Sequence, residues 1–432
     1  MNIPDTGQPR VVVIGGGFGG MSITRKLLNK PVQLVLIDKK NYHTFQPLLY
    51  QVSTSGLEPD SIAFPLRKFL NESSNGYFRM AEVQSIDDRE KQIQTNIGNL
   101  KYDYLVIATG SKTNFFGNEN IENNAVWMKT IPQALNLRSL IFENLEQASI
   151  TEDPDKRKSL LTFVIAGAGP TGVELSGAIA ELRNHIIKKD YKDFDTKEIE
   201  IHLLEGADKV LPPMSEGSSN DAHKYLDKMG VNIHLNTMVK DYKDQVVTTQ
   251  NGESFSTENF IWSAGVHGAP VEGLNAKSLM EKTNRYKVDK YNQVFGYNDI
   301  FAIGDIAQMS TEDWPKGHPM VAQPAIQQGK HLAKNILRRI KGENMQPFEY
   351  FDKGSMATIG RNKAVVDIGK FQLGGFIAWY IWMFVHLWFL IGIKNRLVTF
   401  LNWVYNYINY DKSERLIIRP FKSNRAKLED IE

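Results

Sequence analysis

Two glycine triads with the same spacing are the residues in this chain that are best suited to chemistry. Each follows an apolar, strand-like run and precedes a helix-like run, and the triads are Gly15, Gly17, Gly20 and Gly167, Gly169, Gly172. In such a GxGxxG turn the first glycine permits a tight turn, the second lets the backbone approach a pyrophosphate, and the third lets helix and strand pack closely. The positive helix N-terminus then favours the phosphate charge. The two copies therefore predict two bound dinucleotides, the alternative being glycine turns that bind nothing.

An acidic residue ends the strand that follows each triad. Asp38 closes the run VQLVLID, and Glu205 closes the run EIEIHLLE after an intervening polar segment. Either carboxylate can accept hydrogen bonds from ribose hydroxyls. At Glu205 a carboxylate would bond a ribose 2′-hydroxyl and repel a 2′-phosphate, so NADH is favoured over NADPH. The plainer alternative for Glu205 is a solvated strand end.

The composition restricts the chemistry that the chain can perform. It has 432 residues, 51 Lys and Arg against 49 Asp and Glu, and no cysteine. The balanced charge argues against a surface devoted to nucleic acid. Without cysteine there are no disulfides, thiolate nucleophiles, cysteine-bound zinc or iron–sulfur clusters, and the nine histidines lack metal-ligand spacing, so no metal site is predicted. Redox chemistry would need a bound organic cofactor.

The elements around the triads predict an α/β fold with two Rossmann-type dinucleotide-binding domains. Residues 101–110 and 260–265 are interpreted as chain crossings between them, and a later helix is predicted from about residue 324 to 341. Asp305 ends a buried strand, at the sheet edge where open α/β sheets bind ligands, although capping a helix is its alternative role. The sequence predicts a discontinuous first domain at residues 1–115 and 290–342 and a second domain at residues 116–289. A C-terminal membrane-attachment region is predicted at residues 343–432.

Five motifs along the chain carry a resemblance to a known family. They are VVVIGGGFGG, NYHTFQPLLYQVSTSGLEPDSIAFPLR, VIAGAGPTGVELSGAIAEL, FAIGDIA and AQPAIQQG. Together they resemble the flavoprotein reductases with a disulfide-reductase-like fold, and specifically type II NADH:quinone oxidoreductase. The absence of cysteine separates the chain from branches that work through redox cysteines. The resemblance implies FAD-dependent oxidation of NADH and two-electron reduction of a membrane quinone, menaquinone or ubiquinone, without proton pumping.

The resemblance also implies that the first predicted domain binds FAD and that the second, with its linking helix, binds NADH, and it assigns residues to each cofactor. Around FAD it places Gly15, Gly17, Phe18, Gly19, Gly20, Asp38, Lys39, Thr109, Gly110 and Asp305. Around NADH it places Gly167, Gly169, Pro170, Thr171, Gly172, Glu205 and Gly265. Ala322, which opens the motif AQPAIQQG, is counted with the cofactor-binding residues.

Four further residues are candidates for catalysis. The resemblance places Gln323 and Gln327 at the quinone pocket. Their spacing of four puts both amides on one helical face, where they could donate to a quinone carbonyl. Solvent-facing glutamines are the alternative. The resemblance places Glu174 near the nicotinamide and flavin, and an ordinary first-turn helix acid is its alternative role. Lys370 is a weaker candidate for a polar contact or proton path near the quinone, and an interfacial lysine is preferred.

The C-terminal part of the chain predicts membrane attachment. Residues 371–393 contain no Lys, Arg, Asp or Glu. As one helix they would be long enough to cross a hydrocarbon core of roughly 30 Å. Two glycines, His386 and the amphipathic segment that follows favour instead a monotopic segment lying on the cytoplasmic face of the cell membrane. Eight Lys or Arg against two Asp or Glu in residues 394–427 suit anionic headgroups. A buried helix or the interface of an expected homodimer is the alternative.

Two other functions share part of this pattern. A soluble NADH:ferredoxin or rubredoxin reductase would keep both nucleotide sites but has no use for the uncharged aromatic stretch. A non-enzymatic NADH sensor would keep the glycines without needing the two glutamines. The N-terminus lacks a basic segment leading into an apolar run, so the chain is expected to start in the cytoplasm.

Overall fold

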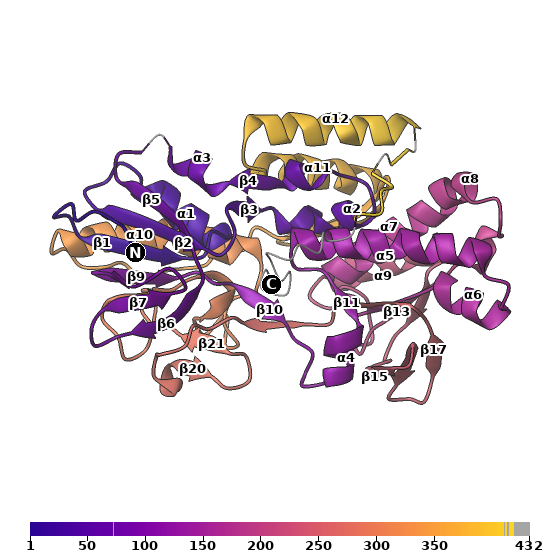
Figure 1. The fold of residues 1–432 in the computed structure, drawn as a ribbon, viewed down its shortest axis with the longest axis horizontal. Coiled ribbons are helices and arrows are strands. Elements are labelled where there is room, and N and C mark those ends of the chain that lie inside the picture. Colours follow the sequence, from indigo (N-terminus) through magenta and orange to yellow (C-terminus); the bar gives the residue numbers. More distant parts are fainter. Residues whose placement is uncertain (72, 410, 413, 419–432) are drawn as a thin grey trace. The chain divides into compact units, whose positions relative to one another are not determined.

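The two glycine turns belong to two different compact units. A computed structural model (Figure 1) describes all residues except 72, 410, 413 and 419–432. Unit 1 comprises Met1–Thr44, Phe64–Lys112 and Val266–Asp352, and unit 2 comprises Phe45–Ala63, Thr113–Gly265 and Lys353–Glu432. Residues 266–289 thus pack with the first unit and the C-terminal segment with the second, whereas the sequence predicts a separate third region. The predicted division by bound cofactor stays a prediction.

Unit 1 is built on a parallel five-stranded sheet in the order β22-β9-β1-β2-β5. Its strands are β1 (Arg10–Ile14), β2 (Gln33–Asp38), β5 (Gly76–Met80), β9 (Tyr104–Ile107) and β22 (Ile300–Ala302). Except for the edge strand β5, the strands are largely apolar because a parallel sheet is covered on both faces, and Val11, Val12 and Val13 are fully buried. Helices α1 (Phe18–Leu27) and α10 (Ala322–Ile340) pack against each other.

Shorter elements complete unit 1 around this sheet. They are β3 (Tyr42–Thr44), α3 (Leu66–Leu70), β6 (Val83–Asp87), β7 (Gln92–Thr95), β8 (Leu100–Lys101), β19 (Val266–Gly268), β20 (Leu279–Met280), β21 (Arg285–Lys287) and β23 (Ala307–Gln308). Of the five points at which the chain passes from one unit to the other, two fall within β4 (Ala63–Pro65) and β10 (Ser111–Thr113).

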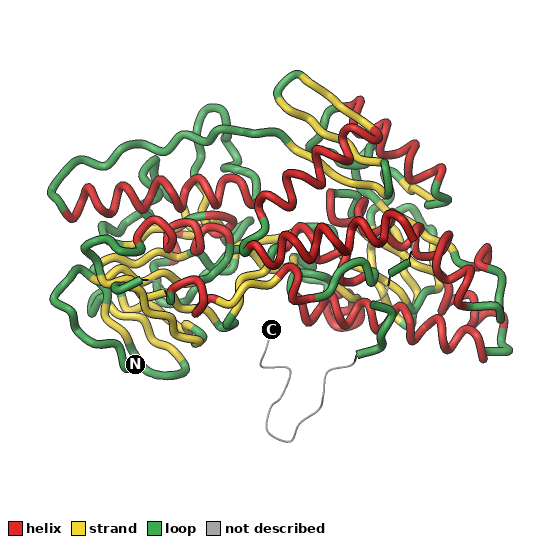
Figure 2. Tube along the Cα trace, turned by 90° about the horizontal axis from the view of Figure 1, so that it is seen from above, coloured by secondary structure: helices red, strands yellow, loops and turns green. Residues whose placement is uncertain are grey.

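Unit 2 has a second parallel sheet in the order β11-β18-β12-β13-β14, in which β18-β12-β13-β14 correspond to β9-β1-β2-β5 of unit 1. The fifth strand differs, because β11 precedes the glycine turn along the chain whereas β22 follows the other strands of its sheet. Its strands are β11 (Val126–Trp127), β12 (Thr162–Ala166), β13 (Glu200–Leu204), β14 (Asn232–His234) and β18 (Asn259–Trp262). Helix α7 (Pro170–Glu181) leaves the glycine turn, as α1 does in unit 1. Figure 2 shows the strands of each unit flanked by helices.

The other elements of unit 2 form its helical cover and two small antiparallel sheets. They are α2 (Leu49–Ser53), α4 (Glu119–Asn124), α5 (Ile131–Ile150), α6 (Pro154–Leu161), α8 (Lys188–Asp190), α9 (Glu216–Lys228), β15 (Val239–Lys243), β16 (Val246–Thr249), β17 (Ser254–Ser256), β24 (Ser355–Gly360), β25 (Lys363–Ile368), β26 (Phe371–Gly374), α11 (Gly375–Phe389) and α12 (Ile393–Asn409).

The apolar stretch at 371–393 is not one helix. It starts as β26, continues as α11 and turns at residues 390–392 before α12. Gly375 has a positive φ of 72°, which ends the strand just where the helix begins. Within the part of the chain that the structure describes, no helix is both long enough and apolar enough to span a membrane.

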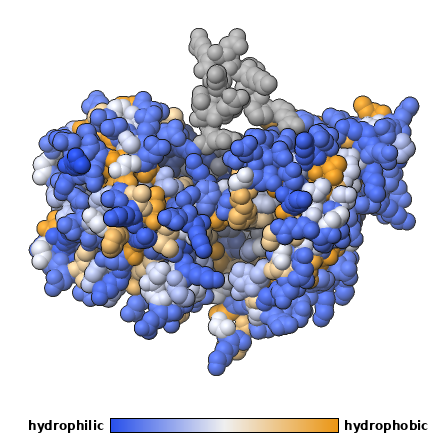
Figure 3. Space-filling view, turned by 90° about the horizontal axis from the view of Figure 1, so that it is seen from below, coloured by the Kyte–Doolittle hydropathy of each residue, from blue (hydrophilic) through white to orange (hydrophobic). Residues whose placement is uncertain are grey.

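Helix α12 turns its polar side toward the protein and its apolar side outward. Asn395 donates to the Ala63 carbonyl at 2.8 Å, Asn406 to the Gly56 carbonyl at 3.1 Å, and the Trp403 indole to Gln51 at 2.7 Å. On α11 and α12 the exposed large side chains include Phe376, Ile377, Phe384, Trp388, Ile393, Leu397, Leu401 and Ile408. We call these eight the apolar surface. The face drawn in Figure 3 is by contrast covered mostly by hydrophilic side chains.

Candidate active site

The first glycine turn leaves the N-terminus of α1 open to a ligand. Gly15 has a φ of 103°, and a Cβ there would lie 2.4 Å from the Ala108 carbonyl oxygen; a Cβ at Gly20 would lie 1.8 Å from that of Gly15. At Gly17, the N-cap residue, a Cβ would meet no atom within 4 Å. No described side chain caps the helix. A helix N-terminus beside open space suits a pyrophosphate.

Asp38 is held beside this turn by two backbone N–H groups. Its Oδ2 accepts from Gly16 at 2.6 Å and its Oδ1 from Lys40 at 2.7 Å. Burial raises the pKa of the carboxyl, and these hydrogen bonds oppose that rise. Because each carboxylate oxygen can accept more than one bond, the side chain can still accept from a ribose hydroxyl. Lys39 is exposed next to it.

The other residues predicted around FAD lie at the carboxyl ends of neighbouring strands of the same sheet. Thr109 follows β9 and donates to the Ala269 carbonyl at 2.6 Å, and Gly110 has a φ of 73° with open space at its Cβ position. Asp305 follows β22 and accepts from the Ser111 hydroxyl at 2.6 Å. The fold thus gathers the predicted residues at one sheet edge, where such sheets bind ligands.

Helix α10 begins at Ala322, two residues before the predicted start. Gln323 and Gln327 are both half-buried, and the Gln327 amide brackets the backbone of Phe351, donating to its carbonyl at 2.8 Å and accepting from its N–H at 3.1 Å. The neighbouring Gln328, which sequence reasoning missed, is buried and accepts from the Gly304 N–H at 2.7 Å. Nothing in the motif AQPAIQQG distinguishes this inward-facing glutamine from the other two.

The second glycine turn reproduces the first in unit 2. Gly167 has a φ of 96° with a Cβ position 2.8 Å from the Cα of Ala264, and a Cβ at Gly172 would lie 1.9 Å from the Gly167 carbonyl oxygen. Gly169 caps α7 with open space at its Cβ position, and α7 begins with Pro170 and Thr171. This geometry likewise fits a pyrophosphate.

Glu205 occupies the place of Asp38. Its Oε2 accepts from the Ala168 N–H at 2.6 Å and its Oε1 from the Ala207 N–H at 2.9 Å. At the end of β18, which lies on the other side of β12, the Ser263 hydroxyl donates to the Ala166 carbonyl at 2.7 Å, and Gly265 is exposed with a φ of 109°. Glu205 and Gly265 therefore lie on the two sides of the glycine turn, at the carboxyl edge of the sheet.

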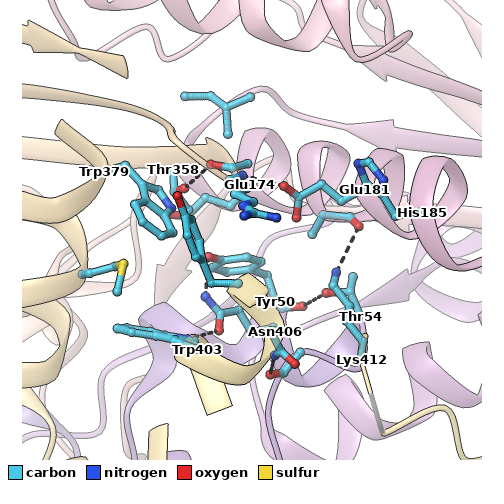
Figure 4. A pocket seen from close by; sticks show the side chains of 18 of the residues that line it. Tyr50, Thr54, Glu174, Glu181, His185, Thr358, Trp379, Trp403, Asn406 and Lys412 are labelled. Carbon is cyan, nitrogen blue, oxygen red and sulfur yellow. Dashed lines mark hydrogen bonds between the residues drawn. The ribbon is translucent and has the colours of Figure 1, made fainter. Parts of the chain in front are cut away.

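A cavity of about 880 Å³, counted with its opening, lies within unit 2. Figure 4 shows Glu174 and Glu181 facing it from α7, with aromatic rings opposite. Its lining includes Tyr50, Gln51, Thr54, Glu174, Ala178, Glu181, His185, Thr358, Arg361, Trp379, Trp382, Met383, Trp403, Tyr407 and Lys412. Of the predicted catalytic residues only Glu174 lines it; Gln323 and Gln327 belong to unit 1, and Lys370 is exposed in the turn between β25 and β26.

Glu174 is a buried carboxyl whose proton is retained near neutral pH. Burial raises its pKa to about 8, against a smaller opposing effect of the Thr358 backbone N–H. The Trp382 indole N–H is buried close to this carboxyl but outside hydrogen-bond geometry. Lys412 is half-buried at the cavity, where desolvation lowers its pKa and Glu181 opposes that shift. A proton donor and a lysine therefore share one aromatic-lined cavity.

Sequence reasoning missed the aromatic lining and Lys412. Tyr50 and Gln51 belong to the motif NYHTFQPLLYQ, so the resemblance could have drawn attention to them. Trp382, Trp403 and Lys412 come from the C-terminal segment, whose inward face a sequence alone does not reveal.

Comparison with known proteins relates the whole chain to one group of enzymes. Residues 9–329 match the pyridine nucleotide-disulphide oxidoreductase family, and residues 353–409 match the NDH2 C-terminal domain. The chain is 37% identical to the type II NADH:quinone oxidoreductase Ndh of Mycobacterium tuberculosis, over 99% of this chain and 95% of that protein. It is 29% identical to an internal alternative NAD(P)H-ubiquinone oxidoreductase of Arabidopsis thaliana, over 93% and 84%.

Solved structures share the fold. NDH2 from Plasmodium falciparum, in complex with NADH, superimposes with a TM-score of 0.86 at 22% identity, covering 95% of this chain and all of that one. The sulfide:quinone oxidoreductase of Aquifex aeolicus gives a TM-score of 0.70 at 21% identity, over 92% and 95%. The predicted fold class and the resemblance that the five motifs carry are confirmed.

Proposed function

The chain belongs to the type II NADH:quinone oxidoreductases, within the pyridine nucleotide-disulphide oxidoreductase family, and we propose that its two units divide the work of that reaction. The enzyme is a flavoprotein that uses FAD and NADH, oxidises NADH and reduces a quinone by two electrons without pumping protons. The ferredoxin reductase and NADH-sensor alternatives find no support among the relatives.

Unit 1 is the proposed FAD site. The uncapped N-terminus of α1 would receive the pyrophosphate, Asp38 a ribose, and Asp305 a hydroxyl of the sugar-like chain. FAD, when bound, accepts a hydride from NADH and delivers two electrons to the quinone. The protein contributes placement, since Asp38 and Asp305 are each fixed by hydrogen bonds of 2.6 Å at the sheet edge.

Unit 2 is the proposed NADH site. The N-terminus of α7 would receive the pyrophosphate and Glu205 the adenosine ribose. Because both oxygens of Glu205 already face backbone N–H groups, the carboxylate is fixed in place. A 2′-phosphate would meet this negative charge, so the site should prefer NADH to NADPH.

The cavity of unit 2 is the proposed quinone route. Its aromatic rings suit an apolar ring and tail, and Glu174 can give a proton to a reduced quinone oxygen because its pKa of about 8 keeps it protonated at neutral pH.

Gln323 and Gln327 remain proposed donors to a quinone carbonyl. An amide nitrogen carries two hydrogens, so Gln327 retains one beyond its bond to Phe351. Lys370, exposed in its turn, is proposed as an interfacial lysine.

We propose that the apolar surface attaches the protein peripherally to a membrane, and that this is the cytoplasmic face of the cell membrane. Contiguous exposed apolar side chains on two helices are costly in water, and anionic lipid would also attract basic residues such as Lys394 and Arg396, which are exposed on the same segment. Phe384→Glu should reduce co-sedimentation with anionic phospholipid vesicles. Phe295→Glu is the matched control, because both phenylalanines are 67% exposed and Phe295 lies in unit 1. The homodimer remains a proposal that light scattering tests.

The observation that carries the quinone assignment is the buried carboxyl among the aromatic rings of the cavity. The experiment is NADH oxidation by the FAD-loaded protein with a short-chain quinone, ferredoxin or oxygen alone as acceptor. Quinone should accelerate turnover well beyond the others. Trp382→Ala should raise the quinone KM and leave flavin reduction by NADH unchanged, because Trp382 lines the cavity. Unchanged quinone kinetics in that variant would remove the cavity from the reaction.

A further inference from the structure

Phe116 combines exposure with a strained backbone. Its side chain is 69% exposed, and its φ is 53°, in the left-handed region that bulky residues rarely adopt. Most other non-glycine residues with positive φ in the described chain are asparagine or other polar residues, which tolerate this conformation. Leu211, the other large apolar one, is fully buried, so packing offsets its strain. Phe116 has no such burial, and strain of this kind gathers at functional sites.

The turn that holds Phe116 is fixed to the end of strand β18. Asn114 donates its N–H to the Gly265 carbonyl at 3.1 Å, accepts from the Trp262 indole at 2.8 Å through its own carbonyl, and accepts the Phe116 N–H through its side chain at 2.9 Å. The neighbouring Phe115 is buried against Trp262. The buried Phe115 therefore holds the turn in place, and the side chain of Phe116 points into solvent.

The Phe116 ring lies over Gly265. A Cβ at Gly265 would be 3.0 Å from the ring's Cζ atom, and Gly265 itself has a φ of 109°, so only glycine leaves the ring in this place. Gly265 follows β18, and Gly167 of the glycine turn approaches the adjacent Ala264 closely. The exposed ring therefore stands at the carboxyl edge of the sheet, beside the proposed pyrophosphate position.

The strand order determines which half of NADH would reach this ring. Strands β18, β12 and β13 are consecutive neighbours, and Glu205 directly follows β13. With the adenosine ribose at Glu205 and the pyrophosphate at the N-terminus of α7, the rest of the dinucleotide extends toward the end of β18. That remaining part is the nicotinamide half.

We propose that Phe116 is a positioning residue that packs against the nicotinamide half of NADH at the end of β18. This rests on the proposed NADH site of unit 2. An aromatic face can hold a ring or ribose by contact while leaving hydride transfer to the cofactors. The strained turn keeps the ring exposed before the ligand arrives, so less ordering is needed on binding.

The test measures binding of NAD⁺ and ADP to the FAD-loaded enzyme by calorimetry, because NAD⁺ does not reduce the flavin and ADP lacks the nicotinamide half. Phe116→Ala should raise the Kd for NAD⁺ roughly twofold to tenfold and leave the Kd for ADP unchanged. Phe116→Trp should bind NAD⁺ as the wild type does. Equal Kd values for NAD⁺ in wild type and Phe116→Ala, or an equal loss for both ligands, would overturn the proposal.

Two further variants separate this proposal from its premises. Glu205→Ala should weaken ADP and NAD⁺ alike; if it changes neither, the NADH assignment of unit 2 fails, whereas a null result in Phe116→Ala alone removes only the role of Phe116. Phe116→Gly relieves the positive φ, so its melting temperature should not fall while NAD⁺ binding weakens. A fall in melting temperature with unchanged NAD⁺ binding would make Phe116 a structural residue.

Discussion

The two glycine turns have the same glycine spacing and the same kind of hydrogen-bonded acid, but different elements pack on the helices that follow them. In unit 1 the fifth residue of α1 is Ser22, whose hydroxyl donates to the Ile326 carbonyl of α10 at 2.8 Å. In unit 2 the fifth residue of α7 is Glu174, which faces the cavity. Helix α10 covers α1, whereas strand β24 covers α7. The geometry of the turn is therefore shared by the two units, whereas the element that packs on the helix differs, and α7 also faces a cavity.

Substitution of the third glycine of each turn, where turn and helix are in close contact, should cause the largest loss of stability in both units. Gly20→Ala and Gly172→Ala would each place a Cβ under 2 Å from a carbonyl oxygen, so the turn must open. We expect destabilisation of about 3 kcal/mol or more, from strain of the kind that overpacking causes. Gly17→Ala and Gly169→Ala are matched controls, because their Cβ positions are empty.

The four variants also test which ligand each turn holds. Gly17→Ala should fold normally and lose flavin, and Gly169→Ala should keep flavin and lose affinity for NADH. Absorbance of bound flavin and thermal melts separate folding from binding. If Gly17→Ala kept its flavin and lost NADH, the assignment of the two units would be reversed.

The second prediction concerns Glu174 and the pH dependence of stability. Its pKa is raised from 4.5 to about 8, so between these pH values the folded protein retains a proton that the unfolded chain has released. Stability therefore falls as pH rises through this window, by roughly 1.4 kcal/mol per pH unit. Glu174→Gln removes the penalty, and its melting temperature should exceed that of the wild type increasingly from pH 5 to pH 8.

Activity should respond in the opposite direction. Glu174→Gln should slow quinone reduction by roughly tenfold or more, since the proposed proton donor is lost, and should abolish any limb of the pH profile near 8. Ser22→Ala, at the corresponding helix position of unit 1, is the control and should change neither pH profile. A Glu174→Gln enzyme with the wild-type profile would assign the proton to another group.

The acids at the two strand ends give a third, smaller contrast. Glu205→Ala should raise the Kd for NADH roughly tenfold and narrow the preference over NADPH, because the negative charge facing a 2′-phosphate is removed. Asp38→Ala should leave NADH affinity unchanged and reduce flavin retention during gel filtration. Loss of flavin from Glu205→Ala would contradict the division between the units.

The sequence predicts the repeated architecture because its signals are local. Apolar strand, glycine spacing and terminal acid together specify the turn, and the structure places Asp38 and Glu205 in equivalent hydrogen bonds. The cavity could not be predicted in this way. Glu174, Trp382 and Lys412 are far apart in the chain, and their meeting depends on how the C-terminal segment packs on α7.

Helical periodicity predicts two faces on α12 without indicating which one faces the protein. The asparagines fill the inward side here because the carbonyls of Gly56 and Ala63 need donors. A single apolar run also suggested one element at 371–393, where the positive φ of Gly375 separates a strand from a helix.

The smallest expected effects distinguish the neighbouring glutamines of α10, the helix that covers α1. Gln327→Ala removes two hydrogen bonds to the Phe351 backbone, which should cost about 1 to 2 kcal/mol, and should raise the quinone KM a few-fold if its second amide hydrogen meets the quinone. Gln328→Ala removes the acceptor of the buried Gly304 N–H, so it should lower stability and flavin retention without changing that KM. Thermal melts and steady-state kinetics on both variants make the distinction. A raised quinone KM in Gln328→Ala as well would mean that α10 acts on the quinone through its overall position, and not through the amide of Gln327.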